Sequence, residues 1–144
     1  MFCHDHPDGD AFDPQPQETS RRDVQLAPPP NRGTFAAVGW RHAGLRAAEL
    51  AAKAPKRLDR LVLCCVPAPT GDLTFDPGAI AAKTLVIYGQ YDDEAPAGDA
   101  KWWKSHLVSA RIEMVPKHGN DVIELSWKRI LSHAAPNTMR AGTR

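Results

Sequence analysis

Four residues near the N-terminus are of the types that bind metal ions, namely His4, Asp5, His6 and Asp8. Imidazole and carboxylate ligands hold a structural zinc ion when about four of them surround it in a fixed geometry. This cluster lies in a proline-rich segment, and the sequence has no second group of histidines or cysteines to complete the ligand set. We therefore expect adventitious metal binding at most, and the sequence predicts neither a metal site nor a cofactor.

Two charged residues, Arg41 and Asp92, each follow a short apolar segment. Arg41 precedes a helix-forming stretch, where the free backbone N–H groups and the helix dipole favour negative charge. It could therefore bind an anion such as a phosphate or a carboxylate. An ion pair with Asp92, or a side chain directed into solvent, is the simpler interpretation, and we favour it.

Four apolar runs have the length and continuity of strands that are buried on both faces. These runs are residues 34–39, 60–66, 84–89 and 111–115. Stretches rich in helix-forming residues separate them. Strand and helix signals that alternate in this way predict an α/β fold with about four parallel strands flanked by helices.

The last predicted helix has the clearest pattern, because the apolar residues of 123–134 fall on one helical face. Asp121 precedes Glu124 by three residues, which predicts a capping box at the start of this helix. An earlier helix carries the adjacent residues Trp102 and Trp103. We expect one of these tryptophans to pack on the sheet and the other to be partly exposed.

The chain divides into three parts by composition. Residues 1–33 are rich in proline and polar side chains, and such a segment buries too little apolar area to offset the entropy of ordering. We expect this segment to be irregular or disordered. One domain is predicted at 34–136, followed by a flexible tail at 137–144.

Three loops of the predicted domain resemble motifs of the α/β-hydrolase family. Residues 38–44 (VGWRHAG) are similar to the family's nucleophile elbow, in which G-x-S-x-G joins a strand to a helix. Residues 85–92 (LVIYGQYD) resemble the loop that bears the catalytic acid, and residues 115–121 (VPKHGND) resemble the loop that bears the catalytic histidine. The resemblance covers about residues 34–134.

The resemblance implies that Asp92 occupies the position of the catalytic acid. Arg41 occupies the position of the nucleophile, and Asn120 occupies that of the histidine. A guanidinium has no lone pair with which to attack a carbonyl, and a carboxamide does not accept a proton at neutral pH. His118 is either a displaced catalytic base or an ordinary loop histidine, and we favour the ordinary loop histidine. His42 follows the position of the nucleophile, and we expect its side chain to have no catalytic role.

The function implied by the resemblance is that of an ester-hydrolase relative that is catalytically weak or inactive. It also implies a truncated member, since the family's first strands and the loop that donates half of the oxyanion hole have no counterpart. The ligand would be a small-molecule ester or an anion. The alternative is a non-catalytic binding module with an anion site at Arg41, or one that self-associates through an open sheet edge at 34–39.

Composition excludes several other classes of protein. The formal net charge is +1, so nothing indicates a nucleic-acid partner. No apolar run approaches the roughly 20 residues that span a membrane, and the N-terminus has no apolar segment typical of a secretory signal. The three cysteines, Cys3, Cys64 and Cys65, do not form a disulfide pattern. We therefore expect a reducing, cytoplasmic location.

Overall fold

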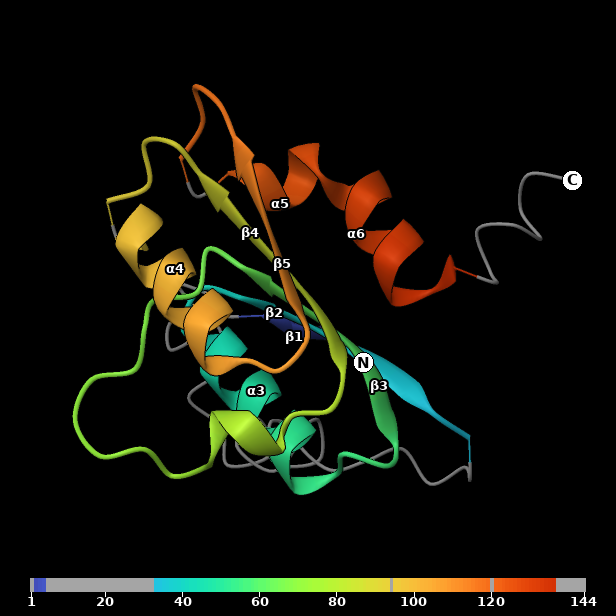
Figure 1. The fold of residues 1–144 in the computed structure, drawn as a ribbon. Coiled ribbons are helices and arrows are strands. Elements are labelled where there is room, and N and C mark those ends of the chain that lie inside the picture. The colour runs from blue at the N-terminus through green and yellow to red at the C-terminus, as the bar shows by residue number, and fades with distance from the viewer. Residues whose placement is uncertain (1, 5–32, 94, 120, 137–144) are drawn as a thin grey trace, which may run out of the picture.

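A parallel sheet forms the centre of the molecule (Figure 1). The structure is a computed structural model, and it describes residues 2–4, 33–93, 95–119 and 121–136. Its strands are β1 (Phe2–His4), β2 (Phe35–Trp40), β3 (Leu58–Cys64), β4 (Lys83–Gly89) and β5 (Ala110–Val115). They lie side by side in chain order, and every neighbouring pair is parallel. The α/β class and the four predicted strands are thereby confirmed.

The short strand β1 differs from the sequence-based expectation. Phe2, Cys3 and His4 pair with Val38, Gly39 and Trp40 of β2. The prediction of an open edge along 34–39 is therefore wrong for the carboxyl half of β2, and residues 2–4 are not irregular. Three residues are too short a segment to show a periodic pattern, so only pairing with β2 reveals this strand. The rest of the N-terminal segment, residues 5–32, lies outside the described residues, as does the tail at 137–144.

Helices cover both faces of the sheet (Figure 1). Helices α3 (Ala43–Lys53) and α4 (Ala97–His106) pack on one face, and α5 (Val122–Leu125) and α6 (Trp127–Ala134) pack on the other. A single 3-10 turn, η1 (Pro77–Ala79), lies in the connection from β3 to β4. Parallel neighbours require such crossover connections, because each strand must return to the same edge before the next begins.

The predicted last helix is divided in two, and its capping box does not form. The helix ends at Leu125 and resumes at Trp127. The Asp121 carboxylate does not cap α5; it accepts a hydrogen bond from the Gly119 backbone N–H at 3.1 Å. The hydrogen bond between Gly119 and Asp121 therefore stabilises the loop before the helix. Such a local bond competes with capping of the helix by the same carboxylate.

Two apolar clusters fill the space between the sheet and its helices. On the α3 and α4 face the cluster includes Leu61, Val86 and Trp103, and on the α5 and α6 face it includes Leu85 and Ile130. Side chains of one strand alternate between the two clusters, as the pleat of a strand requires.

The two adjacent tryptophans behave as predicted. Trp103 is fully buried, and its indole N–H donates to the Val66 carbonyl at 3.1 Å. Trp102 is partly exposed and stacks on the ring of His106, with 3.9 Å between the ring centroids. Helix α4 is therefore attached to the sheet through one indole whose polar atom is satisfied.

Strand β2 and helix α3 approach each other at a pair of glycines. A Cβ atom on Gly39 would lie 2.4 Å from the Cα of Gly44, and a Cβ on Gly44 would lie 2.1 Å from the Cγ2 of Val66. Neither position has room for a side chain. The close approach sets where the turn between β2 and α3 can lie.

We expect Gly39→Ala to lower the free energy of unfolding by about 1–3 kcal/mol, because the added methyl group meets backbone atoms that cannot move aside. Urea unfolding followed by tryptophan fluorescence measures this change. Gly98→Ala is the matched control, because nothing lies within 4 Å of a Cβ at that position of α4. Equal stability of Gly39→Ala and the wild type would contradict the packing argument.

Candidate functional site

Arg41 lies at the bend between β2 and α3, in a backbone conformation that is rare for its residue type. Its φ is 56°, in the left-handed region. The Arg41 backbone N–H donates to the Cys64 carbonyl at 3.0 Å, and its own carbonyl accepts from the Gly44 N–H at 3.0 Å. These two bonds hold a conformation that costs on the order of 1 kcal/mol or more. The bend therefore has the sharp geometry that the sequence pattern of residues 38–44 predicts.

The Arg41 side chain is half-buried, and its guanidinium carbon lies 5.5 Å from the centroid of the Trp40 ring. A cation at this distance from an indole is attracted by the negative face of the ring. The bend therefore places a permanent positive charge at the carboxyl edge of the sheet. Pairing with Asp92, and anion binding by Arg41, stay predictions.

Asp92 follows β4 in a tight turn and is 5% exposed. Its backbone N–H donates to the Gly89 carbonyl at 3.2 Å, and its Oδ1 accepts from the Ala95 N–H at 3.1 Å. The carboxylate is thus held by its own loop. The turn therefore places a buried carboxylate at the carboxyl end of a parallel strand.

The loop after β5 is attached to the loop that carries Asp92. The Tyr91 N–H donates to the His118 carbonyl at 2.9 Å, and the Lys117 N–H donates to Gln90 Oε1 at 3.0 Å. A Cβ on Gly89 would lie 2.2 Å from the Gly119 carbonyl oxygen. Glycine at position 89 is therefore required for the two loops to meet.

The ring of His118 contacts a neighbour in its own loop. Its Nδ1 lies 3.2 Å from Asp121 Oδ2, and the side chains of both residues are substantially exposed, at 41% and 58%. The loop thus places the backbone of His118 beside Tyr91, while its imidazole pairs with Asp121. Asn120 lies outside the described residues. His42 is exposed at the start of α3 and forms no side-chain cap there.

Cys65 also lies at the carboxyl edge of the sheet, which the sequence analysis did not predict. The predicted strand at 60–66 included it, but β3 ends at Cys64. Cys65 then adopts a left-handed φ of 55°, and its Sγ lies 3.9 Å from the Gly119 carbonyl oxygen. Pro67, which cannot continue a hydrogen-bonded ladder, is the sequence signal that could have placed the strand end earlier.

The chemistry of Cys65 is set by its surroundings. A side-chain hydrogen bond with Cys64, burial, and the negative charge of Asp92 all raise the pKa of the Cys65 thiol. The group is 2% exposed. A thiol is nucleophilic only as the thiolate, so Cys65 is a protonated, enclosed group at neutral pH.

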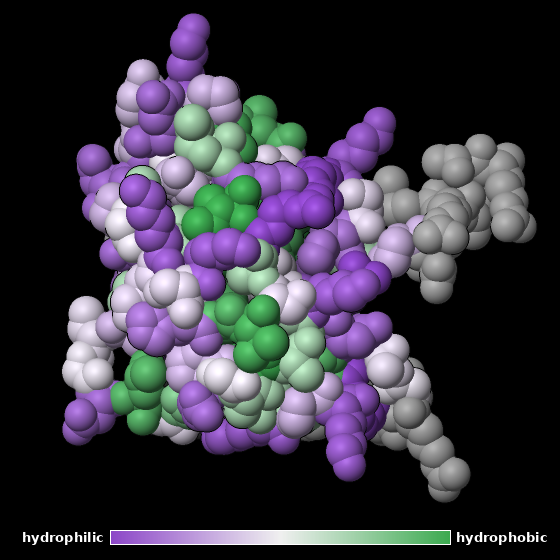
Figure 2. Space-filling view, in the orientation of Figure 1, coloured by the Kyte–Doolittle hydropathy of each residue, from purple (hydrophilic) through white to green (hydrophobic). Residues whose placement is uncertain are grey.

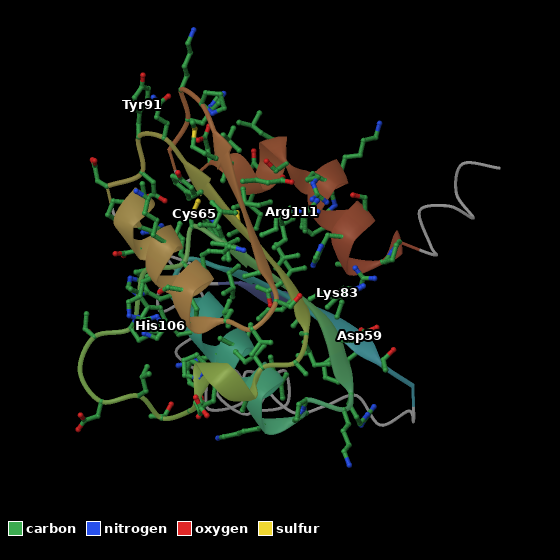
Figure 3. All side chains as sticks on the ribbon, viewed as in Figure 1. Asp59, Cys65, Lys83, Tyr91, His106 and Arg111 are labelled. Atoms are coloured by element: carbon green, nitrogen blue, oxygen red, sulfur yellow. The ribbon has the colours of Figure 1, made fainter. Side chains whose placement is uncertain are left out.

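The carboxyl edge of the sheet therefore gathers a cation, a protonated thiol and a carboxylate. They belong to Arg41, Cys65 and Asp92, which follow three neighbouring strands. Figure 3 shows Cys65 together with Tyr91 in the upper part of the view, away from Lys83. Among the residues that the structure describes, no serine lies in the loops that directly follow β2, β3 and β4. The described serines are Ser105 in α4, Ser109 before β5, and Ser126 and Ser132 near and in α6.

Candidate metal clusters and membrane-spanning helices were sought among the described residues. Residues 2–4, 33–93, 95–119 and 121–136 contain no group of three or more His, Cys, Asp or Glu that could hold a metal ion. Asp5, His6 and Asp8 of the sequence-based candidate cluster lie outside these ranges. Within the same ranges, none of the helices combines the length and the apolar character that crossing a bilayer requires.

Comparison with known proteins identifies the fold. No protein-family model and no curated protein matches the sequence. A CIB-like hydrolase from Thermoplasma acidophilum matches the structure with a TM-score of 0.58 and 21% identity, over 78% of this chain and 54% of that protein. Carboxylesterase CesB from Bacillus subtilis matches with a TM-score of 0.57 and 13% identity, over 72% of this chain and 60% of that protein.

A serine hydrolase involved in carbazole degradation, CarC, matches with a TM-score of 0.58 and 13% identity, over 88% of this chain and 69% of that protein. The chain therefore has the α/β-hydrolase fold. It spans about half to two thirds of the length of these solved structures.

We expect Cys64 and Cys65 to resist thiol reagents in the folded protein. A Cys3→Ser variant treated with Ellman's reagent at pH 8 should release almost no thionitrobenzoate, because both remaining thiols are buried and the pKa of Cys65 is raised. The same variant in guanidinium chloride should release two equivalents.

A Cys3→Ser/Cys65→Ser variant is the control, and it should release one equivalent when unfolded. Rapid labelling of the native Cys3→Ser protein that disappears in this control would show a reactive thiolate at Cys65, contrary to the burial argument.

Proposed function

We propose that this protein is an α/β-hydrolase-fold protein of ester-hydrolase ancestry that does not hydrolyse esters through a serine mechanism. The observation that carries the proposal is the residue at the bend between β2 and α3. Arg41 has the left-handed backbone of a nucleophile elbow and a side chain that cannot attack a carbonyl carbon.

The missing nucleophile is not supplied by a neighbour within the described residues. Cys65 is the nearest candidate by chemistry, but it is buried and its pKa is raised, so it offers no thiolate at neutral pH. Ester cleavage by nucleophilic catalysis requires an activated lone pair within reach of the carbonyl. Arg41 is permanently protonated and offers none.

The base of such a mechanism is also missing. Resemblance to the family assigns the position of the catalytic histidine to Asn120, whose carboxamide does not accept a proton at neutral pH. His118 is two residues away along the chain, and its ring contacts Asp121. Nucleophile, base and orienting acid act as a unit, and loss of one of them lowers the rate by several orders of magnitude.

Other parts of the site support the hydrolase ancestry. The bend is anchored by hydrogen bonds from Arg41 to Cys64 and from Gly44 to Arg41. Asp92 remains buried at the end of β4, and the loop at 117–119 remains attached to the neighbouring loop. These contacts support our proposal that the scaffold of a catalytic triad is retained, while two of the three side chains that resemblance assigns to the triad have different chemistry.

We expect the wild-type protein to release p-nitrophenol from p-nitrophenyl acetate at the rate of buffer alone. A fluorophosphonate probe should leave its mass unchanged, because labelling needs an activated hydroxyl. The Arg41→Ser/Asn120→His variant tests whether the scaffold remains competent, and it should gain probe labelling at position 41.

Adding Asp92→Asn to that variant provides the control, and it should reduce the gained labelling because the orienting carboxylate is lost. Wild-type turnover accompanied by an acylated residue at the carboxyl edge of the sheet would contradict the proposal. So would labelling of the designed variant that Asp92→Asn leaves unchanged, since it would show that Asp92 does not act as the acid.

A further inference from the structure

A second polar region lies at the opposite edge of the sheet from Arg41 and Asp92. A cavity of about 440 Å³ opens where β3, β4 and β5 begin, beside α6. Five basic side chains line it, from three strands and one helix. They are Arg60, Lys83, Arg111, Arg129 and His133. Figure 2 shows strongly hydrophilic side chains gathered to the right of the centre, where β5 passes α6 in Figure 1.

The sheet register brings three of these cations to one face. Arg60 of β3 and Lys83 of β4 are register partners, and Arg111 of β5 is the register partner of Leu85. Lys83 and Leu85 share a face because alternate residues of a strand do. Leu85 belongs to the apolar cluster on the α5 and α6 side, so the three cations lie on the side that α6 covers.

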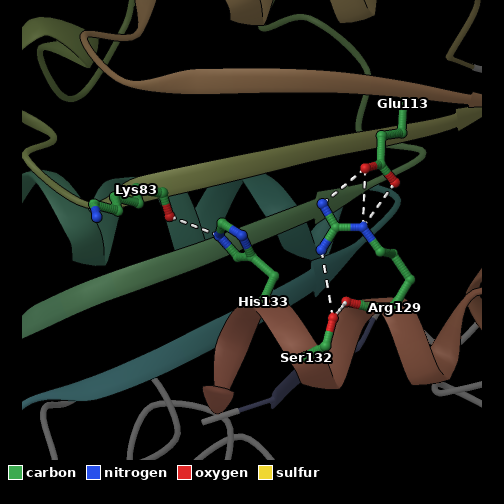
Figure 4. Close-up of polar contacts among 5 residues, drawn as sticks. All are labelled: Lys83, Glu113, Arg129, Ser132 and His133. Atoms are coloured by element: carbon green, nitrogen blue, oxygen red, sulfur yellow. Dashed lines mark hydrogen bonds and ion pairs between the residues drawn. The ribbon is translucent and has the colours of Figure 1, made fainter. Parts of the chain in front are cut away.

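Helix α6 adds two more basic groups, one turn apart. Arg129 pairs with Glu113 of β5, with 2.7 Å between Nη2 and Oε1, and its Nε donates to the same carboxylate at 2.9 Å. The His133 Nε2–H donates to the Lys83 carbonyl at 2.9 Å (Figure 4). These contacts attach α6 to the amino end of β4 and to the middle of β5, beside the cavity.

The charge in this region is poorly compensated. Four cations, Arg60, Lys83, Arg111 and Arg129, line the cavity. Within the described residues, the carboxylate of Glu113 pairs with one of them, Arg129, which leaves an excess of three positive charges among these five groups. Arg60, Lys83 and Arg111 form no ion pair within the described residues. Arg60 and Lys83 are directly opposite each other on neighbouring strands, an arrangement of like charges that destabilises a sheet. An anion bound beside them would relieve that repulsion.

His133 lies in the same positive field. Burial lowers its pKa first, and the positive charges of Arg60, Arg129 and Arg111 lower it further, against the opposing effect of its hydrogen bond to Lys83. Lys83 also lines this cavity, as does Arg129, which pairs with Glu113. The imidazole is therefore neutral at pH 7, and it would gain proton affinity if negative charge entered the cavity.

We propose that this cavity binds the phosphate groups of a small phosphorylated ligand. Guanidinium groups offer pairs of N–H donors that match phosphate oxygens, and Lys83 adds a point charge. The hydroxyl of Ser109, which also lines the cavity, is a further donor. The volume lies in the range of small-molecule sites. A net charge of +3 favours a phosphate or diphosphate group over a single carboxylate.

Inorganic pyrophosphate is the probe, titrated into the full chain by isothermal calorimetry in 150 mM NaCl at pH 7.5. We expect saturable binding that Arg111→Gln and Arg60→Gln each weaken about tenfold or more, because each removes charged hydrogen bonds. Neither side chain forms an ion pair within the described residues, so the variants should remain folded; circular dichroism checks this directly. Arg46→Gln is the matched control, since Arg46 is exposed on α3 across the sheet, and it should leave the affinity unchanged.

Proton linkage gives a second readout. At pH 6.5, the protons exchanged on pyrophosphate binding are measured from the dependence of the binding heat on the ionisation enthalpy of the buffer. Because pyrophosphate itself titrates near this pH, the readout is the difference between two proteins: the wild type should take up more protons on binding, or release fewer, than His133→Gln. Three outcomes would overturn the proposal: no saturable heat with 10 mM pyrophosphate, equal weakening by Arg46→Gln and Arg111→Gln, or succinate binding as tightly as pyrophosphate.

Discussion

The contact between Gly39 and Gly44 is the constraint on which the carboxyl edge of the sheet depends. Because no side chain fits between these backbones, β2 and α3 meet at van der Waals distance and the chain must reverse within the residues between them. Arg41 takes the left-handed conformation that this reversal requires. The backbone of the bend is thus determined by two glycines and two hydrogen bonds, none of which involves the side chain at its apex.

The same sheet has two edges of different chemical character. At the carboxyl edge, the described groups are a cation on an indole, a protonated thiol and a carboxylate held by its own turn. At the amino edge, cations from three strands and a helix face one cavity. Parallel strands put all their carboxyl ends together and all their amino ends together. Strand direction therefore places residues that are scattered along the chain at one end of the strands or the other.

Local patterns were sufficient to predict much of the architecture. Continuous apolar runs predicted four strands and the α/β class, because buried parallel strands leave no polar face. Local patterns failed where a distant partner decides the structure. Residues 2–4 form a strand only because β2 lies beside them. Asp121 has the spacing of a helix cap, yet its carboxylate is used by Gly119 and His118 in the preceding loop.

The sequence alone determined the chemistry of individual side chains. A guanidinium at position 41 and a carboxamide at position 120 exclude nucleophilic attack and proton uptake wherever they lie, because these properties belong to the functional groups. Tertiary structure decided which groups are neighbours. Cys65 meets Gly119, and Arg60, Lys83 and Arg111 share a cavity, through the register of strands that are far apart in the chain. Register depends on the packing of the whole sheet, and no local pattern specifies it.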